Sequence, residues 1–157
     1  MSAIQANGLY KIFGRRAKGG VAMLEAGASR DDLRKDGLTA AVIDASFEVD
    51  PGEIFVVMGL SGSGKSTLIR MVNGLWESTA GELEIYGEKL TKSSDAILRR
   101  IRREKVSMVF QHFALLPHRT VGENAAYGLE IKGLNRTERE ARANEALAMV
   151  GLEGWGG

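Results

Sequence analysis

Several absences bound the interpretation of this 157-residue sequence. It contains no cysteine, which excludes disulfide bonds and thiolate metal sites and fits a reducing compartment. It also lacks an excess of charge: 21 basic and 20 acidic residues leave a net charge of +1, so nothing global indicates nucleic acid or an acidic membrane surface. The longest apolar run, Ile54 to Leu60, is far shorter than the roughly 20 residues needed to span a bilayer.

The N-terminal stretch "MSAIQANGLYKIFG" has polar residues where a signal peptide needs its apolar segment. Hydrophobic residues make up 44% of the chain and charged residues 26%, the mixture typical of soluble globular proteins. The length fits one domain or a piece of a larger one. We therefore expect a soluble chain, which could still dock on a membrane protein.

In the first half, residues 3–13 and 39–50 are typical of strands, and the intervening residues 14–38 predict an insertion of two short helices. Within the insertion, Gly27 ends the first helix, Ser29 caps the second and Gly37 ends it. A further strand is expected from Ile54 to Met58, before a glycine-rich loop and a helix from Lys65 to Asn73.

In the second half, alternation predicts a strand around Leu83 and Ile85, and "SSDAILRRIRREK" predicts a helix. A buried-type strand is expected from Val106 to Phe110. Two capping boxes, Thr120 with Glu123 and Thr137 with Glu140, predict helices over 121–131 and 138–150. Strands that alternate with helices indicate an α/β domain with an added β-rich part.

The segment "GLSGSGKST" matches the phosphate-loop pattern G-x-x-x-x-G-K-[ST]. Glycines allow backbone N–H groups to converge on an anion, Lys65 reaches the β- and γ-phosphates, and the Ser66 hydroxyl binds Mg²⁺. A chance glycine turn before a helix is the competing interpretation, but an apolar segment before the loop and a helical pattern after it favour the phosphate loop. The predicted nucleotide-binding residues of the loop are Gly59, Leu60, Ser61, Gly62, Ser63, Gly64, Lys65, Ser66 and Thr67.

The sequence offers no matching hydrolytic centre. A phosphate-loop hydrolase needs an aspartate at the end of an apolar strand to hold Mg²⁺. After the loop the only aspartate is Asp95, at a helix start, and Asp44 precedes the loop within a segment that is better interpreted as a core strand. His112 and His118 are better interpreted as solvent-facing loop residues than as a metal pair. The run "RRIRREK" is better interpreted as a solvated helix face than as an RNA site, because no aromatic residue is interleaved.

Taken together, these segments resemble the ATP-binding subunit of ABC transporters, and in particular the glycine betaine/proline (quaternary amine) importers. The resemblance rests on "LYKIFG", the helical insertion, "IFVVMGLSGSGKSTLIRMVNGL", "STAGELEIYG" and "MVFQHFALLPHRTVGENAAYGLEIKG". It implies an incomplete P-loop NTPase fold of the ABC ATPase type over residues 1–157. Its parts are an N-terminal β-rich subdomain with the insertion at 14–38, a phosphate-loop unit at 53–75 and a Q-loop region at 105–131.

The resemblance also implies roles for single residues. Phe13 corresponds to the aromatic residue that stacks on adenine, with Tyr10 as the alternative. Gln111 corresponds to the glutamine that senses Mg²⁺ and the γ-phosphate, so Ser66 and Gln111 are the implied metal ligands for Mg²⁺ with ATP. The segment from His112 to Tyr127 corresponds to the surface that receives the transmembrane permease. A second ATP-binding subunit would complete a homodimer on the cytoplasmic face of the membrane.

The family continues with a signature motif, an apolar strand that ends in Asp-Glu and a switch histidine, and none of these occurs in the 157 residues. The resemblance therefore implies an ATPase that drives osmoprotectant uptake, while the chain by itself is expected to bind ATP without hydrolysing it and to be marginally stable. A non-catalytic nucleotide-binding or regulatory fragment is the alternative. A small-molecule kinase is a weaker one, because no lid-like arginine segment follows the loop.

Overall fold

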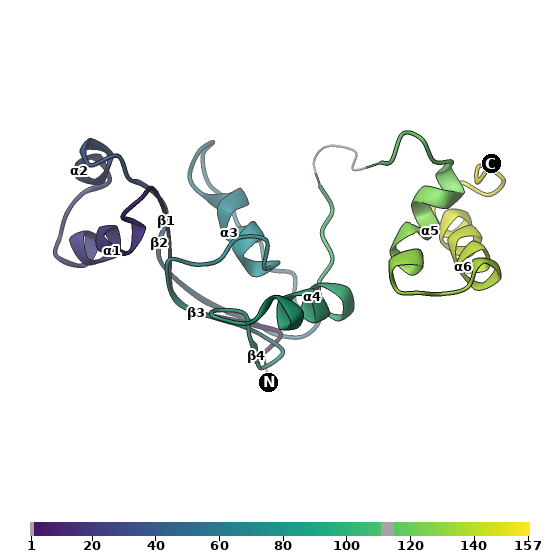
Figure 1. Cartoon of the computed structure of the whole chain (residues 1–157), viewed down its shortest axis with the longest axis horizontal. Helices are drawn as coiled ribbons and strands as arrows, with labels where there is room; N and C mark the ends of the chain where they lie inside the picture. The colour runs from purple at the N-terminus through teal and green to yellow at the C-terminus, as the bar shows by residue number, and fades with distance from the viewer. Residues whose placement is uncertain (1, 111–114) are drawn as a thin grey trace. The chain divides into compact units, whose positions relative to one another are not determined.

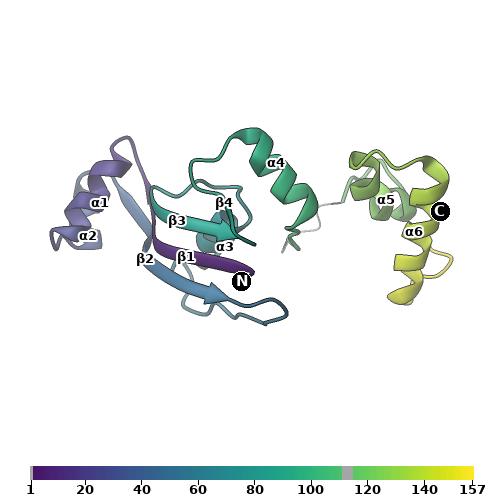
Figure 2. The same cartoon turned by 90° about the horizontal axis from the view of Figure 1, so that it is seen from below.

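The computed structural model describes residues 2–110 and 115–157, and the chain divides into two compact units, residues 1–108 and 109–157. The first unit contains a four-stranded antiparallel sheet in the order β2-β1-β3-β4 (Figures 1 and 2). The strands are β1 (Ile4–Phe13), β2 (Thr39–Val49), β3 (Ala80–Ile85) and β4 (Glu88–Lys89). This sheet confirms the expected β-rich N-terminal part.

Bulges interrupt the pairing of β1 with β2, and residues three apart in β1 are buried. Ala6, Leu9 and Ile12 are all buried, although a regular strand alternates with a period of two. The register to β2 shifts between Ala6 and Leu9, where Gly8 has a φ of 54°, and shifts again between Leu9 and Lys11. Between Ala6 and Leu9, β1 has one residue more than β2, and this extra residue resets the alternation of β1. Between Leu9 and Ile12 the extra residues lie in β2 instead, and Ile12 is buried in the separate core of the insertion.

The second bulge changes the interpretation of Asp44. The sequence predicted a core-strand residue there, and Asp44 does lie in β2, but its side chain is exposed and its φ is 48°. Between its pairings with Leu9 and Lys11, β2 has one residue more than β1, and Asp44 lies in this extra stretch. The bulge leaves a short polar side chain in solvent, in a backbone region that aspartate tolerates better than most residues.

Two helices form the insertion between β1 and β2, as expected: α1 (Ala17–Glu25) and α2 (Arg30–Lys35). The Ser29 side chain accepts a hydrogen bond from the Asp32 amide, and the Asp32 carboxylate accepts one from the Ser29 amide, so α2 starts with a complete capping box. The insertion has a small core of its own, made of Ile12, Val21, Leu33 and Leu38. This core fixes α1 and α2 on the end of the sheet.

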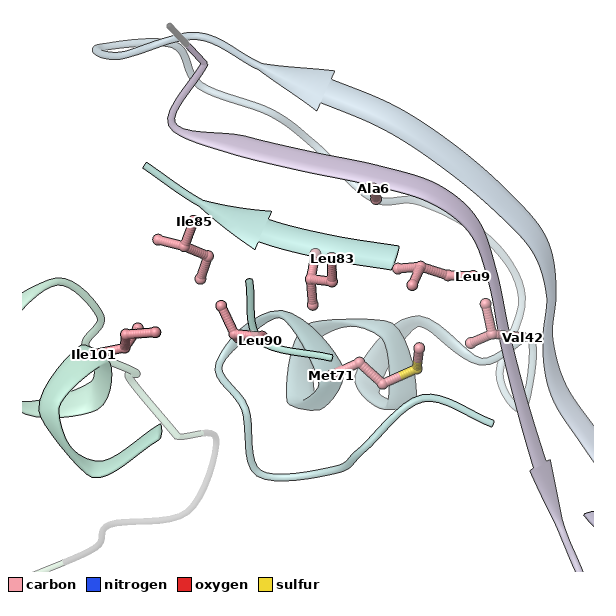
Figure 3. Packing of buried hydrophobic residues seen from close by; sticks show 8 residues of the cluster. All are labelled: Ala6, Leu9, Val42, Met71, Leu83, Ile85, Leu90 and Ile101. Atoms are coloured by element: carbon pink, nitrogen blue, oxygen red, sulfur yellow. The ribbon is translucent and has the colours of Figure 1, made fainter. Parts of the chain in front are cut away.

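Helices α3 (Lys65–Val72) and α4 (Asp95–Glu104) complete the first unit. The main core lies between them and the sheet and contains Ala6, Leu9, Val42, Met71, Leu83, Ile85, Leu90 and Ile101 (Figure 3). Leu83 and Ile85 both face this core, as the alternation in β3 predicted. The arginines of α4 are mainly solvated, and Arg100 and Lys105 both pair with Glu88 of β4, in agreement with the prediction of a charged helix face.

The second unit contains two helices that pack on each other, α5 (Val121–Ile131) and α6 (Arg136–Met149), and their buried residues include Ala126, Ala143 and Leu147. The predicted capping box of α5 is confirmed, with Thr120 and Glu123 exchanging hydrogen bonds. The predicted box of α6 is wrong. This helix begins two residues earlier, because the Asn135 side chain accepts from the Glu138 amide and asparagine is as strong an N-cap as threonine or stronger.

Two predicted strands are not formed. Among the described residues, neither 54–58 nor 106–110 belongs to a strand, and Ile54, Met58 and Val109 are 85% to 97% exposed. A central parallel strand is stabilised by ladder partners on both edges and by cover on both faces. Apolar composition alone does not supply those partners, so neither segment is paired into the sheet that the structure describes.

A matched pair of methionine substitutions tests this difference in burial. In the 157-residue chain, Met71→Ala removes a 1% exposed side chain from the main core and should lower the free energy of unfolding by about 3 kcal/mol. Met58→Ala changes an 85% exposed side chain and should cost less than about 0.5 kcal/mol. Urea unfolding of both variants measures the two effects. Equal losses would show that the segment 54–58 is buried after all.

Candidate nucleotide-binding site

The phosphate loop leads directly into α3, and a glycine sets how closely the two approach the sheet. Gly64 is the N-cap of α3 with a φ of 96°. A Cβ atom at this position would lie 2.1 Å from the Ala41 carbonyl oxygen of β2. Only glycine therefore allows the N-terminus of α3 to lie against β2 in this left-handed conformation.

The first turn of α3 has backbone donors that the fold does not use. Within the described part of the chain, no hydrogen bond is donated by the amide N–H groups of Gly64, Lys65, Ser66 or Thr67. The first amides of any helix lack intrahelical acceptors, and together with the helix dipole they favour an anion. This arrangement is the one that phosphate-loop proteins use to hold nucleotide phosphates.

Lys65 lies over its own loop. Its Nζ atom donates hydrogen bonds to the carbonyl oxygens of Gly59, at 2.7 Å, and Leu60, at 2.6 Å. The ammonium group is thus held by neutral acceptors, and within the described part of the chain it has no carboxylate partner. A phosphate, which is a stronger acceptor because of its charge, can compete for the same protons.

The loop and its surroundings enclose a cavity of about 230 Å³. Six of the nine predicted loop residues line it, and so do residues of α2 and β2 that the sequence did not indicate. The lining residues are Arg30, Arg34, Thr39, Ala40, Ala41, Gly62, Ser63, Gly64, Lys65, Ser66 and Thr67. Gly59 and Leu60 do not line the cavity, but their carbonyl oxygens accept hydrogen bonds from Lys65, which does. Ser61 is exposed.

Phe13 and Tyr10, the two candidates for the adenine platform, have different surroundings. Phe13 is 38% exposed, packs edge-on against Trp76 with ring centres 5.2 Å apart, and lines a separate cavity from the phosphate loop. Tyr10 is half-buried beside the core of the insertion. Burial, together with the carboxylates of Asp44 and Glu25, raises the pKa of the Tyr10 hydroxyl. Phe13 is the better exposed of the two rings.

Of the two implied metal ligands, the described residues include only Ser66. Ser66 lies in the first turn of α3 and lines the phosphate-loop cavity. Gln111 and His112 lie outside the described residues, so the Ser66–Gln111 pair and the interpretation of His112 as a loop residue both remain predictions. His118 is exposed. In residues 2–110 and 115–157, no group of three or more histidine or acidic side chains could hold a metal ion.

In the second unit, Asn124 of α5 fixes the turn that precedes the helix. Its Oδ1 atom accepts a hydrogen bond from the Leu116 amide at 2.7 Å, and its Nδ2 atom donates to the carbonyl oxygens of Leu116 and Thr120. These bonds hold residues 116–120 against the helix start. An apolar groove of about 370 Å³ results, lined by Leu115, Leu116, Pro117, Arg119, Val121, Asn124, Ala125 and Leu147.

Ion pairs between α5, α6 and the turn stabilise this arrangement. Arg119 Nη1 donates to the Glu130 carboxylate at 2.7 Å, and Arg139 lies 3.6 Å from the same carboxylate. The hydrogen bond from Arg119 holds the pKa of Glu130 below its usual range and raises that of Arg119. A larger cavity beside this network, of about 690 Å³, has its arginines balanced by Glu123, Glu130 and Glu140. None of the described helices is both long and apolar enough to cross a membrane.

Comparison with known proteins places this site in a family. Residues 42–156 match the family described as ABC transporter. The chain is 52% identical, over 97% of its length, to the glycine betaine transport ATP-binding protein OpuAA of Bacillus subtilis. It is 49% identical, also over 97%, to the glycine betaine/proline betaine transport system ATP-binding protein ProV of Escherichia coli. It spans 37% and 38% of those two relatives.

Solved structures show the same fold. A dimeric structure of the bacterial ABC transporter cassette MJ0796 superposes with a TM-score of 0.76 at 30% identity, over 98% of this chain and 60% of that one. Its post-hydrolysis dimer with ADP and Pi gives a TM-score of 0.77 at 29% identity, with the same coverage. These matches confirm the expected α/β phosphate-loop fold.

Two glycine substitutions in the loop test the close approach of α3 to β2. In Gly64→Ala the new Cβ atom would lie 2.1 Å from the Ala41 carbonyl oxygen, so the free energy of unfolding should fall by at least about 3 kcal/mol. Gly62→Ala, the matched control, has a φ of 77° but nothing within 4 Å of its Cβ, so only backbone strain of about 1 kcal/mol is expected. Denaturant midpoints measure both. If Gly64→Ala were no worse than Gly62→Ala, the close approach would be refuted.

Proposed function

Because this chain belongs to the ABC transporter family, we propose that it forms the nucleotide-binding part of an importer for glycine betaine, proline betaine or related osmoprotectants. The observation that carries the proposal is the phosphate loop at the start of α3, with its unused amides and its lysine. The solute itself is suggested by the relatives, which are named for glycine betaine transport and are about half identical to this chain.

In this proposal, the site binds ATP together with Mg²⁺. The amides of residues 64–67 hold phosphate oxygens, Lys65 moves from the loop carbonyls to the β- and γ-phosphates, and the Ser66 hydroxyl binds Mg²⁺ together with Gln111. Phe13 offers a partly exposed ring for adenine. The 157-residue chain should bind without turnover, because no aspartate follows an apolar strand after the loop.

Two protein partners complete the proposal. The groove of the second unit, lined by Leu115, Val121 and their neighbours, accepts an apolar segment of a transmembrane permease, and the protein lies at the cytoplasmic face of the membrane. A second ATP-binding subunit pairs with the first, as in the dimeric cassettes of similar fold. A binding-only regulatory fragment is the alternative function, and permease association with ATP-dependent dimerisation distinguishes the importer subunit from it.

Substitution of the loop lysine tests nucleotide binding. Lys65→Ala should weaken ATP binding about tenfold to a hundredfold, because a charge-assisted hydrogen bond to phosphate is lost. Isothermal titration with Mg²⁺-ATP measures the change. Lys132→Ala, which alters an exposed lysine at the end of α5, is the control and should bind like the wild type. Absence of ATP binding by the wild type, or equal binding by Lys65→Ala, would contradict the proposal.

A charge placed in the groove tests the permease surface. Val121→Asp puts a carboxylate at a 43% exposed apolar position that lines the groove, and it should abolish co-purification with the permease. Ile131→Asp, at the other end of α5 and outside the groove, is the matched control. Both variants should retain ATP binding. Equal recovery of permease with both variants would place the contact elsewhere.

A further inference from the structure

The cavity at the phosphate loop has an unusual charge balance. Three of its lining residues are cationic, namely Arg30, Arg34 and Lys65, and no acidic side chain is among the eleven that line it. The chain as a whole has a net charge of only +1, so this local excess is not a general property of its surface. The cavity between α5 and α6 differs, because its arginines pair with glutamates.

The two arginines come from the helical insertion, and the helix presents them together. Arg30 and Arg34 are four residues apart in α2, so they share one side of the helix. Leu33 is fully buried in the core of the insertion and anchors the helix to the sheet. The capping box of Ser29 and Asp32 fixes the start of the same helix. The arginines are therefore carried by an element that is held in place.

The connection from α2 to the cavity is short. Gly37, with a φ of 71°, ends the helix, Leu38 enters the insertion core, and Thr39 begins β2 and already lines the cavity. Ala41, two residues further, is the residue whose carbonyl contacts Gly64. The insertion and the phosphate loop are thus two walls of one cavity, joined through the first residues of β2.

We propose that Arg30 and Arg34 are part of the nucleotide site and hold phosphate oxygens opposite the loop amides. The inference rests on the proposed binding of ATP at this loop. Arginine is suited to this role because its planar guanidinium group donates two parallel hydrogen bonds to a phosphate. Arg30 has no ion pair among the described residues. Within residues 2–110 and 115–157, Arg34 pairs only with the exposed carboxylate of Asp31, at 3.1 Å, so a phosphate can replace that partner.

The test compares glutamine variants by titration of the purified protein with Mg²⁺-ATP and, separately, with inorganic tripolyphosphate. Arg30→Gln and Arg34→Gln should each weaken both ligands about threefold to tenfold, and the double variant about tenfold or more. Arg15→Gln is the control for net charge, because Arg15 is an exposed residue of the same insertion that does not line the cavity. It should bind both ligands like the wild type.

Asp31→Asn separates a phosphate contact from a structural effect. It removes the same ion pair as Arg34→Gln but keeps the arginine, so it should bind ATP as tightly as the wild type or more tightly. A loss with Asp31→Asn equal to that with Arg34→Gln would overturn the proposal. So would arginine variants that bind like Arg15→Gln, or a loss confined to ATP with tripolyphosphate unchanged. Failure of the wild type to bind ATP would instead refute the nucleotide function itself.

Discussion

The contact between Gly64 and the Ala41 carbonyl is the constraint on which the nucleotide site depends. It places the N-terminus of α3 directly against β2, with no room for even a methyl group. Two features follow from this approach: the amides of α3 lie beside the sheet, and the first residues of β2 form a wall of the cavity. Lys65 lies over the same loop, where its Nζ atom donates hydrogen bonds to the carbonyl oxygens of Gly59 and Leu60. The close approach of Gly64 to Ala41 thus brings β2, the loop and α3 together in one site.

The sheet reaches that geometry through bulges. Gly8 and Asp44 both have positive φ angles at register shifts between β1 and β2, and Gly81 of β3 lies so close to Gly8 that a Cβ would meet the Gly8 carbonyl at 2.1 Å. These irregularities turn Leu9 and Val42 toward Met71 of α3, where the main core forms (Figure 3). The site and the core are therefore aligned by the same local departures from a regular sheet.

The sequence predicted what local rules determine. The helix after the glycine-rich loop, the insertion helices and the cap at Thr120 depend on residues a few positions apart, and the structure confirms all three predictions. Segments 54–58 and 106–110 were predicted as strands because they are apolar, but a strand also needs neighbours, which no short window of sequence specifies. Asn135 caps α6 in place of the predicted Thr137 because both residue types are good N-caps, and the sequence alone does not decide between two candidates that lie two positions apart. Arg30 and Arg34 belong to no sequence motif. The sequence did not indicate them because their proposed role depends on the cavity that α2 lines.

The most direct test of the account is a nuclear magnetic resonance titration of the isotope-labelled chain with Mg²⁺-ATP. Because the amides of Gly64 to Thr67 have no acceptor in the described part of the chain, their resonances should shift strongly on binding, together with that of Gly62. The amides of α6 should remain unchanged. Shifts confined to α5 and α6, or unaltered resonances throughout the loop, would contradict the assignment of this loop as the nucleotide site.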